Sequence, residues 1–151
     1  MDETFMRRCL ELAEESRKSG ETPVGALVAR NGEILGEGRE ATRSLLDPSA
    51  HAEIQALRAA CQGAQSLDLP GTTLYTTVEP CVLCAYAIRR AGVSRIIYGI
   101  PAGQAGGVTS RYNLLTDESL TGWPPPPEIL AGVLGAECTE MLRRPRGSRT
   151  G

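Results

Sequence analysis

Two short segments constrain this chain more than any other feature. His51 is the only histidine, and Cys81 and Cys84 stand three positions apart, directly after Pro80. Positions i and i+3 lie on the same face of a helical turn, so the two thiols can reach one point. One imidazole and two thiolates form a ligand set that suits Zn²⁺. We therefore predict one zinc site, and the fold must bring the two segments together.

The same residues predict a catalytic metal. A structural zinc site normally has a full set of protein ligands, whereas a catalytic site leaves one position for water. Cys9, Cys61 and Cys138 are remote in sequence, and Glu53 lies two residues after His51. Because zinc lowers the pKa of bound water to about 7, a nearby carboxylate can take its proton and deliver it elsewhere. Glu53 is therefore the candidate catalytic residue.

Hydrophobic periodicity and turn residues predict alternating helices and strands. Asn31-Gly32 is typical of a two-residue hairpin turn between strands at 24–30 and 33–38. The other expected strands are 72–77, 95–100 and 128–134, and the expected helices are 3–18, about 51–61, 81–91, 110–118 and 136–144. Roughly thirty residues separate the last two strands, which is long enough for a crossover between parallel strands.

Length and composition indicate one domain. The 151 residues are 41% hydrophobic, which suffices for a core, and the net charge is −2. We expect a domain over residues 1–144, followed by a flexible tail over 145–151. The slightly acidic balance argues mildly against a nucleic-acid partner, since such partners favour a basic surface.

The cysteine count and the N-terminus predict a cytoplasmic location. Five cysteines are an odd number, and the three outside the metal segments have no repeating framework. The first residues lack a basic segment followed by an apolar one, and no apolar run approaches membrane-spanning length. We expect no membrane partner.

At these motifs the chain resembles the cytidine deaminase superfamily, and within it the branch of guanine deaminases, yeast-type cytosine deaminases and tRNA adenosine deaminases. The matching segments are Pro23–Ala26, Asp47–Ile54 and Thr73–Cys84. The resemblance runs from about residue 5 to residue 142. It implies a three-layer α/β fold, in which a five-stranded mixed sheet is covered by helices on both faces, and a homodimer.

The resemblance also implies hydrolytic deamination, in which water attacks an amino-bearing ring carbon and ammonia leaves. Glu53 would move the protons. The backbone N–H of Ala52 is expected to bind a substrate acceptor, and the C=O of Val78 or Glu79 to accept from the leaving amino group. The segment that begins near Val24 is expected in the pocket wall. For the Glu79 side chain we expect an exposed charge at a strand end.

Two departures from the branch affect the substrate. Eleven residues before the metal histidine, the branch typically has an Asn that touches the substrate, whereas this chain has Glu40. An ionised Glu only accepts hydrogen bonds, so contact by Glu40 would favour a substrate edge with a donor; the alternative is a solvated loop charge. After Gly99, the tRNA enzymes have a basic segment where this chain has 100–104, Ile-Pro-Ala-Gly-Gln.

From these features we expect a zinc-dependent hydrolase that deaminates a small free nucleobase, nucleoside or related aminated N-heterocycle. The alternative enzyme is a tRNA adenosine deaminase, which converts adenosine to inosine in an anticodon loop. A third possibility is a non-catalytic zinc-stabilised module, which a fourth protein ligand such as Cys61 would support. Arg111 and Tyr112 fit either the pocket or the surface, and Trp123 fits either base stacking or a subunit interface.

Overall fold

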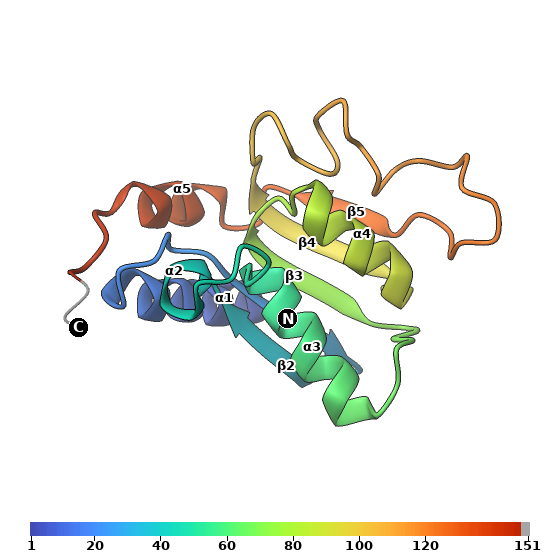
Figure 1. Ribbon diagram of the computed structural model, residues 1–151, viewed down its shortest axis with the longest axis horizontal. Helices are drawn as coiled ribbons and strands as arrows, with labels where there is room; N and C mark the ends of the chain where they lie inside the picture. Colours follow the sequence, from blue (N-terminus) through green and yellow to red (C-terminus); the bar gives the residue numbers. More distant parts are fainter. Residues whose placement is uncertain (149–151) are drawn as a thin grey trace.

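A five-stranded mixed sheet organises the computed structural model, which describes residues 1–148 (Figure 1). Its order is β2-β1-β3-β4-β5. The antiparallel part pairs β1 with β2 and with β3, and the parallel part pairs β4 with β3 and with β5. The strands are β1 (Gly25–Arg30), β2 (Glu33–Arg39), β3 (Thr73–Val78), β4 (Arg95–Ile100) and β5 (Glu128–Ala131). The predicted mixed sheet and its parallel last pair are confirmed.

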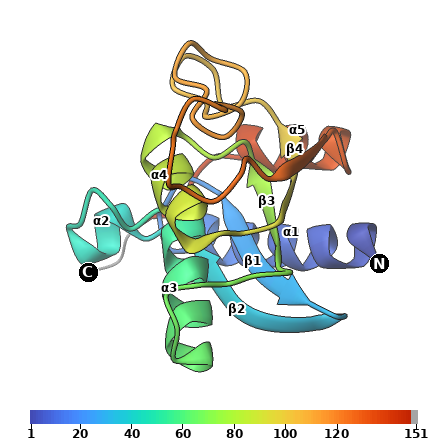
Figure 2. The same cartoon turned by 90° about the vertical axis from the view of Figure 1, so that its right-hand side faces the viewer.

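Helices cover both faces of the sheet (Figures 1 and 2). They are α1 (Asp2–Lys18), α2 (Thr42–Leu45), α3 (Ala52–Ala64), α4 (Val82–Ala91) and α5 (Gly135–Arg143). Side chains alternate along a strand, so Ala26 and Val28 of β1 pack with α3 and α4, whereas Leu27 and Ala29 pack with α1 and α5. The chain therefore has the three-layer α/β fold that was expected.

The hairpin turn forms as its residues predict. Asn31 has φ 53° and Gly32 has φ 79°. Two positive φ angles define the turn whose twist matches the flanking strands, and Asn-Gly adopts it at low cost. Most element boundaries likewise fall within a few residues of expectation, and the last strand is shorter, ending at Ala131.

Two glycines bring α3 close to the edge strand β2. A Cβ on Gly36 would meet the backbone N of Ala60, and a Cβ on Gly38 would meet the backbone of Ala52 and Ala56. Only a residue without a Cβ allows this approach. The close contact fixes the position of the first turn of α3, which lies beside the metal segments.

The short helix α2 was not expected, and a buried carboxylate explains it. Glu21 is almost fully buried and accepts hydrogen bonds from the backbone N–H groups of Arg43 (3.1 Å) and Ser44 (2.7 Å). The hydroxyl of Ser44 donates to the same carboxylate. Acceptors at a helix N-terminus satisfy N–H groups that have no partner within the helix. Glu21 thereby holds the loop between β2 and α3 in place.

The prediction of a helix over residues 110–118 is wrong. A buried arginine donates hydrogen bonds to backbone carbonyls of this segment, one of which a helix would use for its own hydrogen bond. Arg89 of α4 is 2% exposed. Its guanidinium donates to the C=O groups of Leu114 (2.7 Å), Asp117 (2.9 Å) and Pro124 (2.9 Å). In a helix, the Leu114 carbonyl would instead accept from residue 118. The segment forms turns that are tied to α4.

The segment after α5 lies against the end of α1. The backbone N–H of Gly147 donates to the C=O of Arg17 (2.7 Å), and the Arg17 guanidinium donates to the C=O of Pro145 (2.9 Å). The flexibility expected over residues 145–151 stays a prediction, and residues 149–151 lie outside the described part. Among the described residues, no helix is long and apolar enough to cross a membrane.

Candidate metal centre and active site

The segment that contains His51 and the segment that contains Cys81 and Cys84 meet, because the N-termini of α3 and α4 point at the same place. His51 is the N-cap residue of α3, and Cys81 is the N-cap residue of α4, with Cys84 in the first turn. Both helices pack on the same face of the sheet, one before β3 and one after it. Helix N-termini carry partial positive charge and free N–H groups, which favour thiolates.

The ligand atoms have the spacing of a tetrahedral zinc site. His51 Nδ1 lies 3.5 Å from Cys81 Sγ and 3.4 Å from Cys84 Sγ, and the two sulfur atoms are 3.9 Å apart. With Zn–S near 2.3 Å and Zn–N near 2.0–2.1 Å, a tetrahedral ion has an S–S edge of about 3.8 Å and N–S edges of about 3.6 Å. Within residues 1–148, His51, Cys81 and Cys84 are the cluster of possible ligands.

The three ligand side chains shift one another's pKa values. Hydrogen bonds, first from Cys84 and then from His51, lower the pKa of Cys81 to about 4. The pKa of Cys84 is raised well above its ordinary value by its hydrogen bond with Cys81 and by burial. The hydrogen bond with Cys81 raises the pKa of His51 to about 9. A divalent cation favours two thiolates and a neutral imidazole, since binding releases these protons. The donor set fits Zn²⁺ by its ligand types and their spacing.

Glu53 lies in the first turn of α3 beside this cluster. It is 4% exposed, and burial raises the pKa of its carboxyl to about 7, although a hydrogen bond with Cys84 opposes the shift. A carboxyl with a pKa near neutrality exchanges a proton readily in both directions. The structure thus places the expected proton carrier within contact of a metal ligand.

Glu40 is the second carboxylate at the site. It is half-buried, and burial raises the pKa of its carboxyl, whereas hydrogen bonds from the Thr42 hydroxyl (2.9 Å) and the Ala52 backbone lower it. Its own backbone is fixed, because its N–H donates to the C=O of Val24 (3.1 Å) and its C=O accepts from Ser16 Oγ (2.8 Å). Glu40 is thus an ordered group beside the Ala52 N–H, not a solvated loop charge.

The other expected substrate contacts are backbone positions. Val24 is half-buried and packs against the core on the side of α3 and α4. The C=O of Val78 accepts a hydrogen bond from Thr76 Oγ1 (2.9 Å), which leaves one lone pair of this oxygen for another donor. Both positions flank the metal segments, and their contact with a substrate stays a prediction.

The expectation that the Glu79 side chain is exposed is wrong. Glu79 is 2% exposed, and its carboxylate accepts hydrogen bonds from Ala102 N (3.0 Å), Val108 N (2.8 Å), Thr109 N (2.7 Å) and Thr109 Oγ1 (2.7 Å). Burial by itself raises the pKa of this carboxyl, but the four hydrogen bonds outweigh it and leave the pKa below the ordinary 4.5. Glu79 therefore organises the loop after β4, whose donors are 23 to 30 residues away in sequence.

Three residues that organise the site were not found from the sequence: Glu21, Arg89 and the side chain of Glu79. All three are charged groups that are almost completely buried. A buried charge needs partners, but here most partners are backbone groups of distant loops. A sequence has no pattern that marks such partners in advance.

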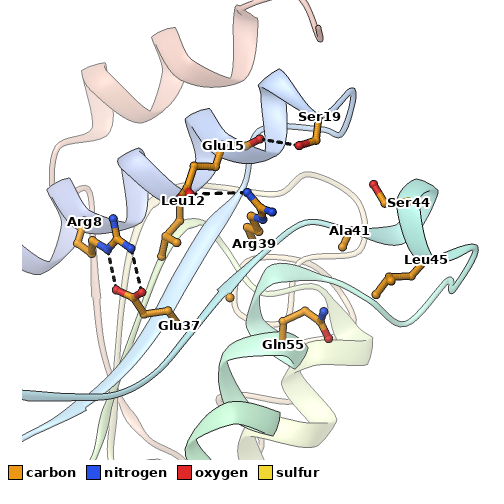
Figure 3. Close-up of a pocket in the computed structure, with 11 residues that line it drawn as sticks. Arg8, Leu12, Glu15, Ser19, Glu37, Arg39, Ala41, Ser44, Leu45 and Gln55 are labelled. Carbon is orange, nitrogen blue, oxygen red and sulfur yellow. Dashed lines mark hydrogen bonds and ion pairs between the residues drawn. The ribbon is translucent and has the colours of Figure 1, made fainter. Parts of the chain in front are cut away.

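A cavity of about 510 Å³ lies elsewhere, between α1, β2, α2 and α3 (Figure 3). Its charged groups are paired: Arg8 donates twice to Glu37 (2.6 and 2.9 Å), and Arg39 lies 3.7 Å from Glu15. Its lining residues are Arg8, Leu12, Glu15, Ser19, Glu37, Gly38, Arg39, Ala41, Ser44, Leu45 and Gln55. None of them is a metal ligand, so this cavity is not the reaction site.

A ligand triad at two helix N-termini, with a buried carboxylate in the same first turn, is the arrangement of a zinc-dependent deaminase. The model of the cytidine and deoxycytidylate deaminase zinc-binding region matches residues 1–100. The chain belongs to this family and is a zinc-type deaminase, so the expected superfamily and cofactor are confirmed.

Relatives within this family include RNA-modifying and base-modifying enzymes. The tRNA-specific adenosine deaminase of Haemophilus influenzae is 40% identical over 93% of this chain and 80% of its own length. A solved structure from work on A-to-I editing by tRNA:A34 deaminases is 33% identical, with a TM-score of 0.84 over 91% of this chain and 98% of that one. The guanine deaminase of Bacillus subtilis is 37% identical, with a TM-score of 0.62 over 66% of this chain and 64% of that one.

Proposed function

We propose that this protein deaminates adenosine to inosine in a tRNA anticodon loop. The observation that carries the proposal is the similarity to tRNA adenosine deaminases along almost the whole chain, together with the zinc ligand triad and Glu53. A small free substrate was expected from the sequence, because the net charge is −2 and residues 100–104 lack basic side chains. Net charge describes the whole surface, however, and RNA binding depends on a local patch.

The zinc ligands would be His51, Cys81 and Cys84, and zinc, when bound, supplies a water molecule with a lowered pKa as nucleophile. Glu53 takes a proton from the attacking water as it adds to C6 of adenine, and passes a proton to ring N1. It then takes the remaining proton from the new C6 hydroxyl and gives it to the amino group, so that C6=O forms as the C–N bond breaks and adenosine and water give inosine and ammonia. A nearby positive charge lowers the pKa of Glu53 and so favours the basic form that begins this sequence.

The backbone groups of the site would orient the base. When a base is bound, the N–H of Ala52 would leave the Glu40 carboxylate and donate to an acceptor of the ring, and the C=O of Val78 or Glu79 would accept from the amino group that leaves. The pocket wall would include Val24, whose carbonyl also fixes Glu40. These roles need the base to be extruded from its stack, because neither group can reach it otherwise.

Basic residues near the end of α1 support an RNA partner. Lys18, Arg143 and Arg146 are exposed and have no ion pair within residues 1–148. The segment after α5 is hydrogen-bonded to Arg17, and both views place it on the side of the molecule where α2 lies (Figures 1 and 2). Unpaired cations of this kind contact phosphates. A tRNA substrate would be met in the cytoplasm, the location expected from the sequence.

The test is a deamination assay with zinc-loaded protein. The substrates are a tRNA anticodon stem-loop with adenosine at the wobble position, the same stem-loop with guanosine there, free adenosine, guanine and cytosine. We expect inosine and ammonia only from the first RNA, and no product from Glu53→Gln protein that still holds one zinc per chain. Ammonia from a free base but not from the RNA would refute the proposal. If the zinc-loaded protein forms no product from any of these substrates, the non-catalytic zinc module would be favoured.

Guanine or a related free base is the second candidate, and Glu40 is the observation that favours it. Adenine presents only acceptors on its ring nitrogens, whereas guanine presents N–H donors that a carboxylate can accept. A Glu40→Gln variant separates the two cases, because an amide can donate. If adenosine in RNA is the substrate and Glu40 contacts it, the variant keeps or gains activity. If guanine is the substrate, the variant loses activity, since one donor of the base is left unpaired.

We also propose that the protein forms a homodimer through the outer faces of α3 and α4. An apolar groove of about 410 Å³ lies between them, and nearby Val82 and Leu83 are exposed. The apolar residues that line it are Ile54, Leu57, Cys61, Leu67, Tyr86, Ala87 and Ala91. An exposed apolar surface of this kind marks a contact site. Light scattering of wild type and Tyr86→Glu protein tests this: the wild type should be a dimer and the variant a monomer.

A further inference from the structure

The loop after β4 is tied directly to the start of the metal helix α4. Gly106 forms a β-bridge with Cys81, and the N–H of Val82 donates to the C=O of Ala105 (2.9 Å). The N–H of Gly107 donates to the C=O of Pro80 (2.7 Å). In both cartoon views this loop lies over the end of α4 where the chain enters from β3 (Figures 1 and 2). The loop is therefore part of the rim around the metal centre.

The same loop holds Arg111 and Tyr112 on a fixed backbone. The Glu79 carboxylate accepts hydrogen bonds from the N–H and the hydroxyl of Thr109, and both the N–H and the hydroxyl of Ser110 donate to the C=O of Gly106. The Ser110 hydroxyl then accepts from the N–H of Tyr112 (3.0 Å), and the C=O of Tyr112 accepts from Leu114 N (2.8 Å). The backbone of Tyr112 is thus linked through Ser110 to Gly106, which forms the β-bridge with the metal ligand Cys81.

The two side chains are exposed although their backbone is ordered. Tyr112 is 47% exposed, and the Arg111 guanidinium lies 5.2 Å from the centre of its ring. Arg111 has no ion pair within the described residues 1–148. A solvent-exposed ring with an adjoining unpaired cation offers a surface for stacking on a nucleobase and a charge for its phosphate.

We propose that Arg111 and Tyr112 form a stacking platform for a nucleotide that flanks the deaminated adenosine. The proposal rests on the proposed function. When the target base is extruded into the pocket, its neighbours stay at the rim and lose a stacking partner. Tyr112 replaces that partner, and Arg111 contacts the adjoining phosphate. Stacking tolerates any base because every base has an aromatic face, so the platform adds affinity for single-stranded RNA without fixing the sequence.

A double-mutant cycle between Tyr112 and the RNA tests the platform. The proteins are wild type, Tyr112→Ala and Tyr112→Phe, and the RNAs are the anticodon stem-loop and two versions that are abasic directly before or after the target adenosine. On the intact RNA, Tyr112→Ala should lower kcat/KM about tenfold through KM, within the range for loss of one base stack. Tyr112→Phe keeps the ring and should keep the activity.

On one of the abasic RNAs, wild type and Tyr112→Ala should be equal, because the base that Tyr112 would contact is missing. Arg111→Ala should weaken RNA binding and reduce its salt dependence, whereas Arg7→Ala, which removes an exposed cation from α1, should do neither. Equal activity of Tyr112→Ala and wild type on the intact RNA would overturn the platform, and so would the same loss on every RNA. No inosine from wild type would refute the proposed function instead, and the cycle would then be judged from binding affinities.

Discussion

Replacing Glu79 by Gln should loosen the loop that borders the metal centre. One carboxylate oxygen accepts from Val108 N and Thr109 N, and the other accepts from Ala102 N and Thr109 Oγ1. A glutamine keeps one acceptor oxygen and turns an NH₂ group toward the remaining donors. The less costly orientation points the NH₂ at Ala102 N and Thr109 Oγ1, because the hydroxyl can rotate and become an acceptor.

The cost follows from that geometry. The N–H of Ala102 loses its acceptor, which costs about 1 kcal/mol, because Ala102 is exposed and this bond is only partly buried. The two remaining bonds change from charged to neutral, which costs about 1 kcal/mol each. The sum is about 3 kcal/mol, and for a chain of this length that corresponds to a fall in Tm of roughly 6–12 °C.

Thermal unfolding of the zinc-loaded protein measures this, with Glu118→Gln as matched control. Glu118 lies in the same long loop, is exposed, and should change Tm by less than about 2 °C. The comparison should also depend on pH. The folded pKa of Glu79 lies below 4.5, so its contribution is present above that pH and is lost as the pH falls through the lower folded value. The difference between wild type and Glu79→Gln should therefore shrink in acid.

A Tm of Glu79→Gln within about 2 °C of wild type at pH 7 would refute the reasoning, since the estimate of three lost or weakened bonds rests on burial and geometry alone. An equal loss in the Glu118→Gln control would refute it too, because the effect would then not depend on the buried hydrogen bonds.

Three further predictions concern the metal, the glycine contact and the buried arginine. Removal of zinc by a chelator should abolish deamination and lower the Tm, and Zn²⁺ but not Mg²⁺ should restore both. Gly38→Ala should destabilise the protein by about 2 kcal/mol, because its Cβ would meet the backbone of α3, whereas Gly63→Ala in the exposed part of α3 should be neutral or stabilising in urea unfolding. Arg89→Met should speed hydrogen exchange over residues 113–118, while the exposed neighbour Arg90→Met should not.

The RNA substrate that we propose differs from the small free substrate expected from the sequence, and the difference has a physical reason. That expectation rested on the net charge of −2 and on residues 100–104, which lack basic side chains. Both observations are correct, but the exposed cations after α5 and at Arg111 come from other parts of the chain. A sum over all residues cannot show where charges meet on the surface.

The sequence by itself determined most of the helices and strands and the metal ligands of this protein. His51 and the two cysteines lie in two short segments, and helix spacing alone sets Cys81 and Cys84 on one face. The hairpin turn at Asn31-Gly32 is likewise a local property of two residues. Signals of this kind need no knowledge of the rest of the chain, since the residues that interact are neighbours along it.

Only the tertiary structure decided how the rim of the site is held. The carboxylate of Glu79 binds groups thirty residues away, Arg89 binds carbonyls up to thirty-five residues away, and Glu40 meets the Ala52 N–H across a loop. Most of these partners are backbone groups, which are the same in every residue and leave no mark in a sequence. In the sequence these charged residues look like surface groups, but in the fold they are buried and hold the segments around the metal centre. A buried charge is stable only where the fold supplies its hydrogen bonds.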